Sequence, residues 1–119
     1  MKIREIKDIL DAKLICGEEN LESEVYSACC SDMMSDVLAY VKDQGVLITG
    51  LVNSQVIRTA NMMDMVCIVF VRDKTPTEEM VELAKEFGIV VMKTALRAFE
   101  ASGYLYSRGL GKKSGEKDA

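Results

Sequence analysis

The chain has 119 residues, of which 49% are hydrophobic and 29% charged, values that predict one domain with a buried core. Its net charge of −4 and aromatic content of 6%, without tryptophan, argue against a nucleic-acid partner, because they offer neither a basic face nor stacking platforms. Histidine is absent, which excludes Ser-His-Asp and Cys-His catalysis and two-histidine metal sites, so we expect no enzymatic activity and no cofactor.

The first ten residues, MKIREIKDIL, mix charges with apolar positions and do not form the apolar core of a signal peptide. No apolar run approaches the roughly 20 residues that span a bilayer. Four cysteines (Cys16, Cys29, Cys30 and Cys67) stand in apolar surroundings without C-x-x-C spacing, which favours reduced, buried thiols. We therefore expect a cytoplasmic protein with no membrane contact.

The N-terminal third predicts a helix and two strands. Ile3, Ile6 and Leu10 have helical spacing among charged residues, so an amphipathic helix should open the chain. A strand and a turn should follow at 12–17, then a solvated loop at 18–20 and a weak second strand over 23–28.

The period then changes to that of a helix, because Met34, Val37, Leu38 and Val41 recur at i, i+3, i+4 and i+7. Ser31 or Ser35 should cap its N-terminus, and Gly45 should follow its end.

The second half alternates strands and helices. Apolar runs predict strands at 46–50, at 65–71 (the central strand) and at 89–92. Asn53-Ser54 should cap a helix that reaches Met63, with Val56, Ile57 and Ala60 inside. Thr75-Pro76-Thr77-Glu78 resembles a capping box with Pro76 at the first helical position, before an apolar stripe closed by Gly88. Leu96, Phe99 and Tyr106 mark a last helix.

Short connections between alternating strands and helices predict parallel strands joined by right-handed crossovers. We therefore expect a three-layer α/β fold, with a mostly parallel sheet covered by helices on both faces. The domain should occupy residues 1–110. Residues 111–119 are polar and should form a disordered tail.

With this order of elements, the chain resembles the DRTGG domain family. The resemblance rests on SDMMSDVL at 31–38, VLITG at 46–50, IVFV at 68–71 before a charged turn and Pro76, and GIVV at 88–91 leading to Thr94 and the last helix. The string DRTGG itself does not occur. The resemblance implies a small α/β regulatory module that commonly dimerises, with a fold similar to the N-terminal domains of HPr kinase and the Mur ligases. It implies no catalytic residue.

The resemblance and the residues together indicate ligand-binding candidates. Ser31, Asp32 and Ser35 enter a helix N-terminus, where backbone N–H groups are free, although they are equally explained as helix caps and first-turn acids. Thr49 and Gly50 follow a strand at the sheet edge where α/β proteins place ligands, although a tight turn explains this pair as well.

Arg72 follows the central strand at the same sheet end, where it could neutralise an anionic ligand or simply lie in a solvated turn. Three further features stay open. Asp32 and Asp36 could share a divalent cation, but hard-cation sites usually have more ligands, so we expect no metal. Cys29 and Cys30 could form a redox pair, though buried structural cysteines are favoured. Methionines at 33, 34, 62, 63 and 65 could fill the core or line an interface.

Two functional interpretations follow. The favoured one is a non-enzymatic regulatory or ligand-sensing module, a homodimer that binds a nucleotide or small anionic ligand near Ser31, Thr49 and Arg72. The alternative is a protein-interaction adaptor that uses its methionine-rich helices. A sensor predicts a pocket bounded by those three residues, whereas an adaptor predicts a filled cleft there and an apolar patch elsewhere.

Overall fold

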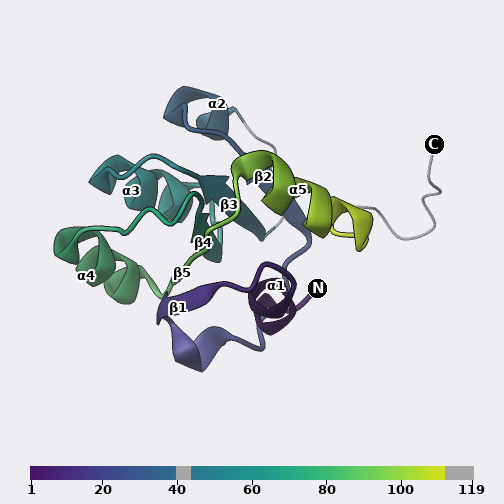
Figure 1. Ribbon diagram of the computed structural model, residues 1–119. Coiled ribbons are helices and arrows are strands. Elements are labelled where there is room, and N and C mark those ends of the chain that lie inside the picture. Colours follow the sequence, from purple (N-terminus) through teal and green to yellow (C-terminus); the bar gives the residue numbers. More distant parts are fainter. Residues whose placement is uncertain (40–43, 112–119) are drawn as a thin grey trace.

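A computed structural model describes residues 1–39 and 44–111 and has three layers, with a sheet between two sets of helices (Figure 1). The elements are, in chain order, α1 (Ile3–Ile9), β1 (Lys13–Cys16), the 3-10 helix η1 (Glu18–Asn20), β2 (Ser27–Cys30), α2 (Met34–Leu38), β3 (Gly45–Thr49), α3 (Ser54–Met62), β4 (Cys67–Phe70), α4 (Glu78–Phe87), β5 (Val90–Lys93) and α5 (Ala98–Ser107).

The sheet has five strands in the order β1-β5-β4-β3-β2. β2, β3, β4 and β5 are parallel, and β1 pairs with β5 in the antiparallel direction. β4 is the middle strand of the sheet, and all four of its residues are buried. The sequence predicted this central position from the apolar run that contains β4. The expected mostly parallel sheet with helices on both faces is therefore confirmed.

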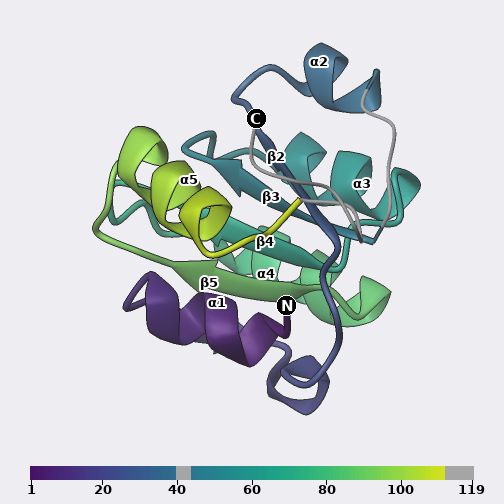
Figure 2. The same ribbon diagram turned by 90° about the vertical axis from the view of Figure 1, so that its right-hand side faces the viewer.

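Alternate strand residues enter two separate cores. Val46 and Ile48 pack with Ile6 of α1 and Leu105 of α5, whereas Leu47 packs with residues of α3 and α4 on the other face. Figure 2 shows α1 and α5 together in front of the sheet, with α3 and α4 behind it. This alternation follows from the two-residue period of a strand.

Several predicted helix ends are confirmed. The side chain of Asn53 caps α3 by accepting a hydrogen bond from Gln55 N–H, and Val56, Ile57 and Ala60 are fully buried. Gly88 ends α4 in the left-handed conformation, with φ of 72°.

Other predicted boundaries were wrong. Thr77, not Thr75, caps α4, because its hydroxyl accepts the N–H of Met80, and Pro76 lies before the helix rather than at its first position. Residues 18–20, expected as a loop, form η1. The second strand, expected over 23–28, is β2 (Ser27–Cys30) and therefore ends two residues later than predicted.

The helix after β2 also differs from the prediction. Met33, not Ser31 or Ser35, is the N-cap residue of α2, and its side chain forms no capping hydrogen bond. The Ser31 hydroxyl instead accepts a hydrogen bond from Met33 N–H at 3.0 Å, in a turn before the helix. α2 is assigned over five residues, and Gly45 begins β3. The expected continuation of this helix through Val41 lies outside the described residues, and so does the predicted tail at 111–119 apart from Gly111, which is an exposed turn residue.

Candidate ligand-binding site at the strand ends

A polar cluster joins the turns that follow β2 and β3. Oδ1 of Asp32 accepts a hydrogen bond from the Thr49 hydroxyl at 2.9 Å and another from Gly50 N–H at 2.7 Å. The Thr49 hydroxyl in turn accepts Leu51 N–H at 3.2 Å. The two strands are parallel, so their carboxyl ends meet at one sheet edge, and this brings Asp32 to Thr49 and Gly50, which lie 17 and 18 positions further along the chain.

The carboxylate of Asp32 is stabilised in its charged form. The hydrogen bond from Gly50 N–H lowers the pKa of Asp32, with smaller lowering by the Thr49 hydroxyl and the charge of Arg72, against an opposing effect of burial. Thr49 is buried and Asp32 is exposed, so the cluster is anchored on its inner side and open to solvent on its outer side.

Arg72 lies against this cluster. Its guanidinium is so close to Gly50 that a Cβ atom there would clash with it, so the glycine leaves room for the cation. Arg72 and Asp73 both adopt the left-handed conformation, with φ of 56° and 57°, which is uncommon for residues other than glycine. Their N–H groups donate to Leu96 and Thr94 carbonyls at 2.8 Å each, and these bonds hold the unusual turn.

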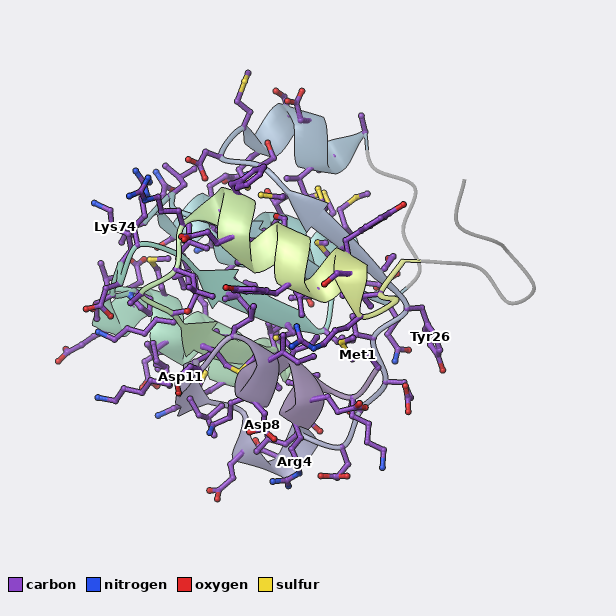
Figure 3. The ribbon with its side chains drawn as sticks, turned by 45° about the vertical axis from the view of Figure 1, so that its right-hand side comes forward. Met1, Arg4, Asp8, Asp11, Tyr26 and Lys74 are labelled. Atoms are coloured by element: carbon purple, nitrogen blue, oxygen red, sulfur yellow. The ribbon has the colours of Figure 1, made fainter. Side chains whose placement is uncertain are left out.

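The two serine candidates lie differently. Ser31 adjoins the cluster, because its N–H donates to the Ile48 carbonyl at 3.1 Å and continues the pairing of β2 with β3. Ser35 lies in the first turn of α2 and is exposed. In Figure 3, Lys74, just after Arg72 and Asp73, and Tyr26, just before β2, lie on opposite sides of the molecule and mark the carboxyl and amino edges of the parallel sheet.

The shape of this edge differs from the pocket that a sensor predicts. Five hollows of the described surface are lined by residues other than Ser31, Asp32, Thr49 and Arg72. Asp32 and Arg72 themselves occupy the space above the Thr49-Gly50 turn. A ligand at this edge would therefore have to displace Arg72 or bind to its outer side.

Two further features were not anticipated from the sequence. Asp73 forms an ion pair with Lys93 at 3.4 Å, which links the turn after β4 to the end of β5. A hollow also lies between β2 and α5, lined in part by Phe99, Gly103 and Tyr106. Its sequence signal was a glycine in the middle of a predicted helix, a residue that lowers helix stability.

The vicinal cysteines do not form one site. Cys29 packs in the core on the α3 side of the sheet, and Cys30 lines the hollow on the α5 side, because successive strand residues point to opposite faces. Burial raises the pKa of the Cys29 thiol, with Cys30 and Asp36 adding to the effect. The prediction of buried cysteines holds for Cys16 and Cys67, but Cys29 is only half-buried and Cys30 is exposed.

Within residues 1–39 and 44–111, no three histidine, cysteine, aspartate or glutamate side chains are grouped to hold a metal ion. None of the helices in this described part has both the length and the apolar character needed to cross a bilayer.

The fold and the polar strand ends define a three-layer α/β domain with its ligand candidates at the carboxyl edge of a parallel sheet. The chain belongs to the DRTGG domain family, whose model matches residues 5–107, as the resemblance predicted. No curated protein matches the chain.

A solved structure supports the fold. It is the crystal structure of the CBS and DRTGG domains of the regulatory region of Clostridium perfringens pyrophosphatase, complexed with the activator diadenosine tetraphosphate. The two chains share 20% identity and superpose with a TM-score of 0.69. The match covers 87% of this chain and 45% of the clostridial chain, so this chain spans less than half of that one.

Proposed function

We propose that this protein is a non-enzymatic regulatory module that binds a small anionic ligand, such as a nucleotide, at the carboxyl edge of its sheet. The observation that carries the proposal is the position of Arg72, an exposed cation held in a left-handed turn against Gly50 and Asp32. An unusual backbone conformation held by two hydrogen bonds is typical of residues positioned for function. The nucleotide activator of the clostridial regulatory region supports this ligand class.

The chemistry would be capture of a phosphate group by Arg72. In the described state the guanidinium lies against Gly50, and its charge contributes to lowering the pKa of Asp32. A phosphate group would compete for this cation, because arginine binds phosphate through paired charge-assisted hydrogen bonds. Asp32 would then keep its bonds to Thr49 and Gly50, so the edge of the sheet would stay intact while the turn after β4 changes its contacts.

The test is calorimetric titration of the purified protein with diadenosine tetraphosphate, ATP and inorganic pyrophosphate. We expect saturable binding of at least one of them, lost in Arg72→Gln. Lys74→Gln is the matched control, because it removes an exposed cation from the same turn and should keep the affinity. The proposal would be contradicted if the folded protein bound none of the three ligands, or if Arg72→Gln and Lys74→Gln bound them equally well.

The second candidate is a protein-interaction adaptor, and exposed methionines favour it. Met33 beside α2 and Met62 at the end of α3 are 61% and 64% exposed, and flexible methionine side chains adapt to partner surfaces. A second copy of the chain is the partner we propose, in keeping with the expected homodimer. Sedimentation velocity of the wild type and of Met33→Ser with Met62→Ser tests this, since a dimer through these residues should dissociate in the double variant.

A reducing compartment, the cytoplasm, remains our proposed location. All four cysteines are free thiols, and one of them is exposed, as expected where disulfides are not maintained.

A further inference from the structure

The hollow between β2 and α5, here called the α5 groove, is separate from the polar cluster of Asp32, Thr49 and Gly50. It has a volume of about 530 Å³, within the size range of small-molecule pockets. Ala28 and Ile48 of the sheet and Leu105 of α5 line it. No described residue that lines the groove is charged. A buried charge without a partner is costly, so this lining favours an uncharged occupant.

One face of α5 forms a wall of the groove. Phe99, Ser102, Gly103 and Tyr106 stand at i, i+3, i+4 and i+7 and all line it. Phe99 is 89% exposed and Tyr106 is 67% exposed, although both are large aromatic residues. Aromatic rings make favourable stacked and edge-to-face contacts with other flat rings, so this wall suits a planar ligand.

Gly103 keeps the groove open between these rings. It lies in the middle of α5, where glycine makes a helix less stable than alanine does. Its φ is not in the left-handed region, and a Cβ atom at this position would meet no atom within 4 Å. Neither backbone conformation nor packing within the described chain therefore requires a glycine, and its effect is to leave space in the groove.

Ser102 provides the polar group. Its hydroxyl oxygen is buried and has no hydrogen-bond partner among the described residues. A buried hydroxyl without a partner is unfavourable, and most such groups in proteins are bonded to protein, water or ligand. Ser102 also lines the groove, so a ligand with a hydrogen-bonding group beside its ring would satisfy the hydroxyl once rotation of the side chain turns it toward the groove.

We propose that the α5 groove binds an uncharged, flat aromatic ligand, packed against Phe99 and Tyr106 over the open space of Gly103 and hydrogen-bonded to Ser102. This ligand differs in charge from the anionic ligand proposed for Arg72. The two sites can therefore be tested separately.

The probe is N-phenyl-1-naphthylamine, an uncharged aromatic amine whose fluorescence rises in apolar sites. We expect one probe to bind per chain. Its sulfonated analogue, 1-anilinonaphthalene-8-sulfonate, has the same rings with a negative charge and should bind more weakly. Equal or tighter binding of the charged analogue would overturn the assignment of an uncharged ligand.

Variants locate the probe on α5. Gly103→Leu should weaken binding by about tenfold or more, because its side chain occupies the groove. Ser107→Leu is the matched control, since it adds the same side chain at an exposed position of α5 outside the lining, and it should bind normally. Arg72→Gln should also bind normally, which separates this site from the proposed anion site. Wild-type affinity in a folded Gly103→Leu protein would refute the proposal.

A measurement on the wild type avoids dependence on folding of the variants. Cys30 lines the groove and is exposed, so bound probe should slow its reaction with 5,5′-dithiobis(2-nitrobenzoic acid). An unchanged rate at saturating probe would overturn the site. Sedimentation velocity of the same samples tests whether a second copy of the chain occupies the groove instead. If the wild type is a dimer and Gly103→Leu is a monomer, the groove is a dimer interface, and the ligand proposal is overturned.

Discussion

Replacing Asp32 by alanine should destabilise the whole domain, although Asp32 itself is exposed. The substitution leaves the buried Thr49 hydroxyl and the buried Gly50 N–H without their acceptor. An unsatisfied buried polar group costs about 1–3 kcal/mol, and water on the open side of the cluster should recover part of that for each group. We therefore expect a total loss of about 1–3 kcal/mol.

Thermal unfolding followed by circular dichroism measures this loss. For a domain of this size a change of 1 kcal/mol moves Tm by about 4 °C, so Asp32→Ala should melt about 4–12 °C lower than the wild type. Asp32→Asn keeps an oxygen that can accept both hydrogen bonds and should lose less than half as much. If Asp32→Ala melts with the wild type, or if Asn is as damaging as Ala, the hydrogen bonds do not hold the two turns together.

The same comparison has a defined pH dependence. The folded state lowers the pKa of Asp32 below its ordinary value of 3.8, so its charged form stabilises the fold above that pH. This contribution is lost as the pH falls through the folded pKa. The difference in Tm between wild type and Asp32→Asn should therefore be constant near neutral pH and shrink below about pH 4. A difference that stays constant into strong acid would contradict a charged carboxylate in this role.

Three further predictions concern the core, a helix end and the thiols. Leu105→Ala should lower the free energy of unfolding by about 2–5 kcal/mol in urea titration, because Leu105 is buried between α5 and the sheet; a loss below 1 kcal/mol would mean that the two do not pack tightly. Gly88→Ala should lower it by about 1–2 kcal/mol, since residue 88 has a φ of 72°, and an unchanged midpoint would contradict that conformation. Cys30 should react first with a thiol reagent, whereas Cys67, whose pKa is raised by complete burial, should react only on unfolding; early loss of Cys67 would contradict its burial.

The predictable part of the fold is the part fixed by local pattern. The apolar run of β4 and the stripe of α4 predict buried elements because strand and helix periods are properties of short segments. The helix after β2 was predicted less well, since Ser31 and Ser35 both resemble caps and tertiary contacts decide which oxygen is used. The Ser31 hydroxyl forms a turn with Met33 N–H instead.

For the candidate site, too, the position in the fold could be predicted from the sequence, whereas the side-chain contacts could not. The carboxyl edge of the sheet could be predicted from strand direction, and this placed Thr49 and Arg72 at one edge. That Asp32 accepts from Thr49 and Gly50, and that Arg72 fills the space above Gly50, depends on side-chain directions that no local pattern contains. The α5 groove was missed for a related reason, because an open space is created by the packing of two elements and not by either sequence.

Hydrogen bonds of the segment before α5 connect the turn of Arg72, at the carboxyl edge of the sheet, with α5 and α1 on one face. The turn that holds Arg72 is tied by its backbone to Leu96, which stands directly before α5, and the hydroxyl of Thr94 extends the connection to the Leu10 carbonyl at the end of α1. A shift of α5 would therefore be transmitted to the turn of Arg72 through the main-chain hydrogen bond to Leu96, which side-chain substitutions leave in place. Thermodynamic linkage makes such a coupling reciprocal. If a ligand at Arg72 changes the affinity of the α5 groove for its occupant, that occupant changes the affinity of Arg72 for its ligand by the same factor.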